Sequence, residues 1–276
     1  MIKTFFLMFI IGLLLMSCNS KLNSNKIRYT TNNDSVIYYY NTGWKQIMDD
    51  GNYTNAEVSY RKALDIDPNF LIGKSVLARL TTNLDERIAL YNELEQGKLT
   101  INGDELLVLE VYIALTKFTN IREQMPEKAA EALKEAFAIG ENNLRKIIHK
   151  YPEEIYLKSE YIEILHSLYG AKTALDSLQL LASNKQKNNP FLLGYAAIME
   201  AELGNFQIAI NKANRLKKII NDTTISKPDA ILADVYFKMN NLQKAKMHVD
   251  KAFLIDSKNL DVSRLKTRID EKLIKP

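Results

Sequence analysis

The sequence predicts an all-α protein in which about six antiparallel helix pairs stack into a solenoid. Three observations support this fold class. Three segments share one pattern: a turn residue, a large apolar residue two positions later, and alanine three positions further on. Elsewhere, apolar residues recur at the three- and four-residue spacing of amphipathic helices. No stretch shows the two-residue alternation that is typical of a half-buried strand. The three segments are GNYTNA at 51–56, GNFQIA at 204–209 and NNLQKA at 240–245.

Each position of the shared pattern has a physical role in a helix pair. Glycine or asparagine at the turn permits the left-handed backbone conformation that ends a helix. The large apolar residue fills the gap between two antiparallel helices. Alanine lets those helices approach closely, and the spacing keeps the apolar residues on one face.

The first copy, GNYTNAEVSYRKALDIDP from Gly51 to Pro68, resembles the tetratricopeptide repeat. That family has Gly, an aromatic residue, Ala, an aromatic residue, Ala and Pro at these spacings. The resemblance implies a right-handed superhelical array of helix pairs whose concave groove holds a peptide or a neighbouring protein.

The repeat spacing predicts where the pairs lie. Ala56 and Ala209 are 153 residues apart, and Ala245 follows 36 residues later. Four intervals of about 38 residues and one of 36 fit the ~34-residue period with modest insertions. We therefore expect helix pairs at 36–67, 70–97, 103–150, 154–187, 190–220 and 228–256, followed by a capping helix at 259–274.

Local signals justify these elements in turn. The run Tyr38–Tyr40 precedes Trp44 and Ile47 and fits a first helix better than a strand. The strongly apolar segment 104–118 predicts a buried helix in the third pair. Pro126 fits a helix start and Pro152 closes that pair, while a break near Gly140 stays open. Leu260, Leu265, Ile269 and Leu273 give the capping helix its inward face.

The N-terminus predicts an export signal. Lys3 precedes twelve residues without a polar side chain, Phe5 to Met16. A helix of that length spans roughly 18 Å, well short of a ~30 Å bilayer core, which favours a cleavable peptide over a membrane anchor. The end of this segment, Leu15-Met16-Ser17-Cys18, resembles the bacterial lipobox. The resemblance implies cleavage after residue 17 and acylation of Cys18.

This interpretation divides the chain into three parts. Residues 1–17 form the lipoprotein signal peptide, residues 18–34 the lipidated Cys18 and a flexible tether, and residues 35–276 the repeat domain. Asn19 to Asp34 is rich in Asn and Ser and lacks apolar periodicity, as a tether does. Because Asn19 is not Asp, the enterobacterial inner-membrane retention signal is absent. We expect a lipid-anchored envelope protein at the outer membrane, on its periplasmic or its surface face.

No catalytic constellation is visible, so the sequence predicts no enzyme, no metal site and no cofactor. His149, His166 and His248 are far apart and are interpreted as surface or capping residues. The pairs Asp49-Asp50 and Glu153-Glu154 are interpreted as solvated charges at helix ends. The net charge of +4 gives no electrostatic case for nucleic acid as a partner.

Charge is distributed unevenly along the chain. Residues 85–154 contain 14 acidic and 9 basic residues, whereas residues 205–276 contain 15 basic and 8 acidic residues. The basic end suits an acidic partner, anionic headgroups or self-association against the acidic middle. Ordinary solvated faces are the alternative.

The leading functional hypothesis is a lipid-anchored protein–protein interaction scaffold of the bacterial envelope, with an envelope protein or peptide as partner. Aromatic residues at helical spacing, such as Trp44, are expected in the core rather than against a ligand. The alternatives are an accessory lipoprotein for outer-membrane glycan or nutrient capture, or for outer-membrane protein or pilus assembly. By analogy with the repeat family, outward residues of the first helices line the groove: Tyr38, Asn41, Lys45, Asp49, Glu202, Asp234, Phe237 and Lys238.

Overall fold

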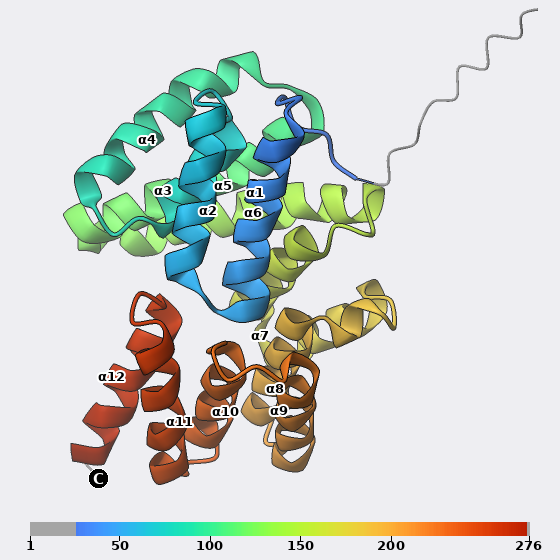
Figure 1. The fold of residues 1–276 in the computed structure, drawn as a ribbon, viewed down its shortest axis with the longest axis vertical. Helices are drawn as coiled ribbons and strands as arrows, with labels where there is room; N and C mark the ends of the chain where they lie inside the picture. The colour runs from blue at the N-terminus through green and yellow to red at the C-terminus, as the bar shows by residue number, and fades with distance from the viewer. Residues whose placement is uncertain (1–25, 275–276) are drawn as a thin grey trace, which may run out of the picture.

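The protein is described here by a computed structural model, which covers residues 26–274. Within those residues the secondary structure is entirely helical (Figure 1). The predicted signal peptide and Cys18 lie outside the described residues. The α-helices are α1 Asp34–Lys45, α2 Tyr53–Ile66, α3 Leu71–Leu80, α4 Leu84–Gly97, α5 Gly103–Gln124, α6 Ala129–Lys150, α7 Ile155–Leu181, α8 Pro190–Glu202, α9 Phe206–Ile220, α10 Lys227–Lys238, α11 Leu242–Ile255 and α12 Leu260–Ile274. A π-helical turn η1, Gln46–Asp50, extends α1, and 3-10 turns lie at Lys98–Thr100, Pro126–Lys128 and Gln186–Asn188.

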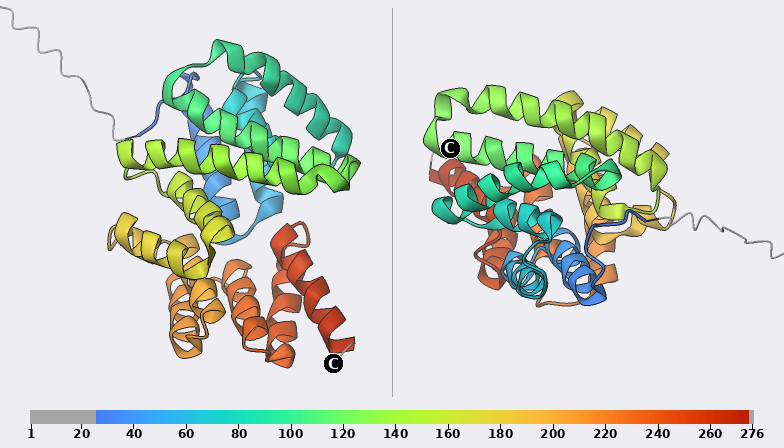
Figure 2. Two further views of the ribbon diagram at one scale, coloured as in Figure 1. Left: turned by 180° about the vertical axis from the view of Figure 1, so that it is seen from behind. Right: turned by 90° about the horizontal axis from the view of Figure 1, so that it is seen from above.

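The predicted all-α solenoid of helix pairs is confirmed. Consecutive helices pack against each other as α1 with α2, α3 with α4, α5 with α6, α8 with α9, and α10 with α11, and α12 caps the last pair. Figure 1 shows α1–α6 gathered at one end of the molecule and α8–α12 at the other, with α7 between them, and the view from behind in Figure 2 shows the same division.

The fourth predicted pair, 154–187, turns at one residue. Gly170 lies inside α7 with φ 83° and ψ 172°, a backbone conformation that breaks the helical path. Only glycine adopts this region readily, because a Cβ atom clashes with the backbone there. The two halves of α7 therefore run in different directions and provide the missing pair.

A break near Gly140, which the sequence left open, does not occur. Gly140 is buried in the middle of α6, which runs unbroken from Ala129 to Lys150. An added Cβ atom there would collide with Cδ1 of Ile164 on α7. The glycine permits close approach of two helices instead of ending one.

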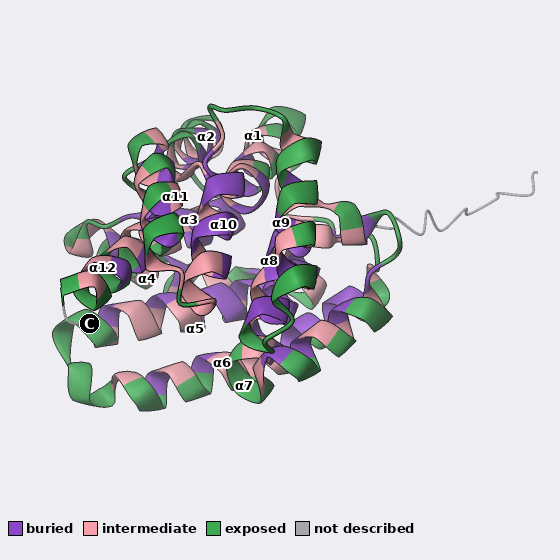
Figure 3. Ribbon diagram, turned by 90° about the horizontal axis from the view of Figure 1, so that it is seen from below, coloured by how far each residue is buried: buried purple, intermediate pink, exposed green. Residues whose placement is uncertain are grey.

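The hydrophobic core consists of three clusters arranged along the solenoid. The largest extends from Ile27 to Met199, the second from Leu193 to Val235, and the third from Ala233 to Ile269. Buried residues follow the inner sides of the helices (Figure 3). Trp44 belongs to the first cluster and stacks on Tyr156 with ring centroids 6.1 Å apart. The prediction that Trp44 is a core residue is confirmed.

Residues 26–33 form a strap on the helical body, which corrects the prediction of a flexible tether for this part of residues 18–34. The side chain of Ile27 is 7% exposed, and its backbone N–H donates to Oε1 of Glu154 at 3.1 Å. The Tyr29 ring packs edge-on against Tyr40 and Phe70. Two apolar side chains within a polar segment are enough to dock it, because both fill gaps in the first cluster.

Of the helices between residues 26 and 274, none is both long and apolar enough to cross a bilayer.

Candidate functional site

A groove runs along the inner side of the solenoid and is made of two adjoining cavities of about 360 Å³ and 410 Å³. The first helices α3, α5, α7, α8 and α10 line it, together with α12, η1 and residues of α1, α2 and α4. We call it the inner groove. Seven residues border both cavities: Ile47, Tyr53, Glu163, Phe191, Lys227, Asp261 and Arg264.

Aromatic rings and cations alternate along the inner groove. Phe191 stacks on Tyr195 with centroids 5.5 Å apart, and Nζ of Lys227 lies 4.6 Å from the Phe191 ring. Further along, the guanidinium of Arg122 lies 5.2 Å from the Phe118 ring. Phe191 is buried, whereas Tyr195 and Phe118 are half-buried, so the rings and the cations beside them give the groove wall both apolar area and charge.

The centre of the inner groove holds groups with perturbed acidity. Burial, then the charges of Glu160 and Asp261, raise the pKa of Glu163 to about 8. Burial lowers the pKa of Lys227 against the attraction of Asp261 and Glu163. Among the described residues neither group has an ion pair within 4 Å. Perturbed, unpaired charges in a concave surface are typical of functional sites.

Three of the predicted groove residues meet at one end of the inner groove. Lys238 lies 3.3 Å from Oε2 of Glu202 and 3.6 Å from Oδ1 of Asp234. Nε2 of His166 lies 3.3 Å from Oε1 of Glu202, and its Nδ1 lies 2.7 Å from the Tyr195 hydroxyl. Asp234, Lys238 and His166 line the cavity. Glu202, Asp234 and Lys238 therefore lie at the inner groove, and their role in binding a partner stays a prediction.

Phe237 lies beside this network but does not line the inner groove. Its ring is covered by two cations, Arg268 at 4.8 Å and Lys272 at 5.4 Å from the centroid. Both cations belong to α12, so Phe237 joins the capping helix to α10.

The predicted groove residues of the first pair lie elsewhere. Tyr38, Asn41 and Lys45 border a separate cavity of about 830 Å³ between the strap, α1 and the start of α7. Tyr38 is 65% exposed, and Nζ of Lys45 is 2.8 Å from Asp50. The structure thus separates these three residues from Glu202, Asp234 and Lys238 at the inner groove.

Asp49 is buried, which corrects both its assignment as a groove residue and its interpretation as a solvated charge. The carboxylate accepts hydrogen bonds from the Tyr156 hydroxyl at 2.9 Å, the Asn189 side chain at 2.8 Å and the Phe191 N–H at 3.3 Å. Three donors compensate the loss of water. Asp49 therefore joins the first pair to α7 and α8.

Two of the three histidines lie in surroundings other than those expected. His149 is exposed near the end of α6, as predicted. His248 is largely enclosed: it stacks on Tyr236 with centroids 5.6 Å apart, and its Nδ1 lies 2.8 Å from Oδ1 of Asp229. His166 belongs to the groove network. The interpretation as surface or capping residues is therefore wrong for His166 and His248.

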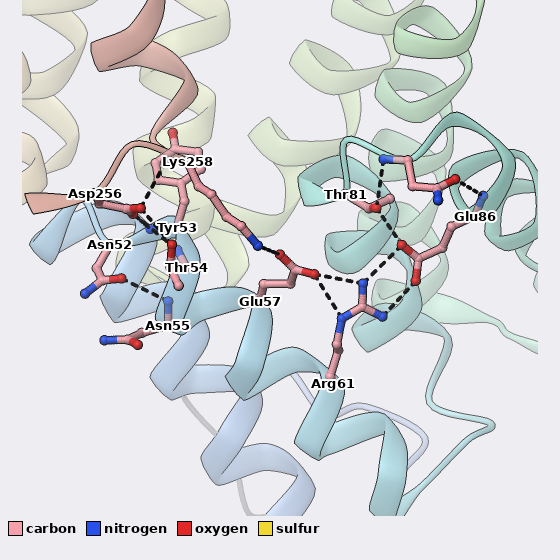
Figure 4. Close-up of polar contacts among 11 residues, drawn as sticks. Asn52, Tyr53, Thr54, Asn55, Glu57, Arg61, Thr81, Glu86, Asp256 and Lys258 are labelled. Atoms are coloured by element: carbon pink, nitrogen blue, oxygen red, sulfur yellow. Dashed lines mark hydrogen bonds and ion pairs between the residues drawn. The ribbon is translucent and has the colours of Figure 1, made fainter. Parts of the chain in front are cut away.

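The first and last repeats touch each other across the mouth of the inner groove (Figure 4). Oδ2 of Asp256 accepts the backbone N–H groups of Tyr53 at 2.6 Å and Thr54 at 3.2 Å, and Oδ1 accepts the Thr54 hydroxyl at 2.7 Å. Nζ of Lys258 lies 3.1 Å from Glu57. An acidic side chain from the last repeat thus caps the first turn of α2.

Three further hydrogen bonds join the last repeats to the turn before α2 and to Tyr53 at its start. The carbonyl oxygen of Gly51 accepts hydrogen bonds from the Ser226 hydroxyl and the Asn259 side chain, both at 2.9 Å. The Tyr53 hydroxyl donates to Asp261 at 2.8 Å. The solenoid is therefore closed end to end by polar contacts.

Sequence reasoning missed Glu163, Lys227, Phe191 and Tyr195 as groove residues. A signal for some of them existed. Lys227, Asp234 and Lys238 are seven and four residues apart, so they share one face of α10. Phe191 and Tyr195 have the same relation on α8. Identifying which helix face turns inward would have found both sets.

Within residues 26–274, no group of three His, Cys, Asp or Glu side chains is placed to hold a metal ion. The inner groove offers rings, cations and carboxylates in a concave surface, which suits recognition of a polypeptide segment.

Comparison with known proteins supports the repeat assignment locally. The family model described as tetratricopeptide repeat matches residues 48–70. None of the curated proteins is significantly similar to the chain in sequence. Among solved structures, "Crystal structure of APC/C hetero-tetramer Cut9-Hcn1" aligns with 86% of this chain and 44% of that chain, at 15% identity and a TM-score of 0.37. The aligned part is less than half of that protein, and a likeness at this level says nothing about function.

Proposed function

We propose that the protein is a lipid-anchored interaction scaffold of the bacterial envelope that holds a segment of a partner protein in the inner groove. The observation that supports this proposal is the groove itself, which follows the first helices of successive pairs and presents titratable groups without ion pairs beside aromatic rings. Preformed helices lose little entropy on binding. The repeat match at 48–70 is consistent with a protein partner.

The lipid anchor rests on the sequence around Cys18. Leu15-Met16-Ser17-Cys18 has the order of a lipobox, and Cys18 is the single cysteine of the chain. Stable anchoring needs more than one acyl chain. Labelling cells with a palmitate analogue tests this part directly: we expect the full chain to be labelled and the variant Cys18→Ser to be unlabelled and released from membranes. Equal labelling of both would contradict the anchor.

Photo-crosslinking in cells tests the groove. A benzoylphenylalanine at position 118 replaces an aromatic ring that lines the inner groove, and the same probe at Phe206 on α9 provides a matched control. We expect one dominant protein adduct from position 118 that is absent from position 206. Adducts that carry only glycan would favour nutrient capture, and identical adducts from both positions would contradict the groove assignment.

A further inference from the structure

The end-to-end contact is unusual for a solenoid. In repeat proteins each repeat contacts its neighbours, and the ends are normally free. Here the turn before α2 and its first residues, 49–57, contact residues 256–261 of the last repeat. We call these two segments together the clasp. In Figure 1 the blue turn between α1 and α2 faces the red turn between α11 and α12.

The clasp is held by hydrogen bonds rather than by shared hydrophobic packing. Residues of the first pair belong to the first hydrophobic cluster, whereas the buried residues of α11 and α12 belong to the third. A hydrogen bond contributes only about 0.5–1.5 kcal/mol net, since water replaces it when it breaks. The contacts of the clasp are therefore weaker than the packing within each cluster.

The clasp also borders the inner groove. Tyr53 and Asp261, joined by a hydrogen bond of 2.8 Å, line both of its cavities. Separation of the two segments widens the groove at the point where its cavities meet.

We propose that the clasp opens to admit a segment of the partner protein into the inner groove and closes behind it. This inference rests on the proposed function, because it specifies how the same groove is reached. Asp256 is the central residue of the device, since its carboxylate accepts three hydrogen bonds from Tyr53 and Thr54.

A distance measurement tests opening without any partner. In the full chain with Cys18→Ser, spin labels are placed through Asn55→Cys and Ser257→Cys, two exposed positions on the two segments. We expect Asp256→Ala to give a longer and broader distance distribution. The matched control is Asp222→Ala, because Asp222 accepts the same two kinds of hydrogen bond from Thr224 within its own loop. We expect Asp222→Ala to leave the distance distribution unchanged. An unchanged distribution in Asp256→Ala would overturn the clasp.

A covalent lock tests gating. Thr54→Cys with Asp256→Cys places two thiols where the side chains now touch, and oxidation closes the clasp permanently. With the position-118 probe, we expect the oxidised protein to lose the partner adduct and the reduced protein to recover it. An adduct that persists in the oxidised protein would overturn gating while the proposed function stands. If the unlocked protein itself gives no adduct, the proposed function fails, and the distance measurement alone decides whether the clasp opens.

Discussion

At the scale of single residues, Lys158 shows how a buried charge stabilises a helix end. Its side chain is 2% exposed, and Nζ donates to the carbonyl oxygens of Pro152 and Leu181 and to Oε1 of Gln186, at 2.7–2.9 Å. We expect Lys158→Met to lower the free energy of unfolding by about 1–3 kcal/mol, because the carbonyl oxygen of Leu181 loses this donor, while Pro152 and Gln186 each keep one other donor. Urea denaturation measures this. Lys172→Met, which removes only an exposed pair with Asp176, serves as the control and costs under about 0.5 kcal/mol.

Glu163 predicts a pH dependence of stability. Its pKa in the folded protein is about 8, above the ~4.3 of a glutamate in an unfolded chain. The unfolded state therefore releases this proton first, so the contribution of Glu163 is complete below pH ~4.3 and is lost as the pH rises towards 8. We expect Glu163→Gln to be less sensitive to pH across this range.

Unfolding in urea at pH 5, 6.5 and 8 measures the difference between wild type and variant. Asp49, Glu105, Glu154 and Asp234 also have raised pKa values, so only the difference isolates Glu163. Glu131→Gln, at an exposed position of α6, should follow the wild type. Parallel curves for Glu163→Gln and wild type would show that Glu163 ionises normally.

At the scale of elements, two glycines that both lie within helices are required for different physical reasons. Gly170 needs its backbone conformation, and no atom lies within 4 Å of an added Cβ. Gly140 has ordinary helical geometry but no room for a Cβ beside Ile164. We expect Gly170→Ala and Gly140→Ala each to lower the free energy of unfolding by about 1–3 kcal/mol, which a lower melting temperature would report. Adding Ile164→Val should rescue Gly140→Ala only. Rescue of Gly170→Ala as well would contradict backbone strain as its cause.

The elements themselves were largely predictable. Helix pairs and the cap follow from apolar spacing and turn residues, which are local signals that a sequence carries directly. The turn at Gly170 was missed because a glycine inside an apolar helix pattern also occurs where helices pack closely, as at Gly140. The strap was missed because Ile27 and Tyr29 are two apolar residues in a polar segment, and their docking depends on gaps formed by α1, α3 and α7.

The candidate site was only partly predictable. Asp234 and Lys238 line the inner groove and Glu202 lies beside Lys238 at its end, but their role in binding stays a prediction. Tyr38, Asn41 and Lys45 were assigned to the same surface, yet the curvature of the solenoid turns that part of α1 towards the strap. Curvature accumulates from small rotations between repeats, which no local pattern reports.

At the scale of the whole molecule, closure links the two ends of the chain. In an open solenoid, loosening the last helix leaves the first repeat unaffected, because coupling passes only between neighbours. In this protein Asp256 accepts hydrogen bonds from the backbone N–H groups of Tyr53 and Thr54, so the first turn of α2 depends on the last repeat. Hydrogen exchange at these two amides reports that dependence.

The variant Ile269→Ala tests whether the first turn of α2 depends on the last repeat. Ile269 is fully buried in the third hydrophobic cluster, and its truncation costs about 2–5 kcal/mol of local stability. We expect faster exchange at the amides of Tyr53 and Thr54, more than 200 residues away in sequence. The amide of Glu86, which donates to Asn83 within the second pair, should exchange at its wild-type rate. Unchanged exchange at Tyr53 and Thr54 would mean that the two ends do not stabilise each other, and that the solenoid behaves as an open array in solution.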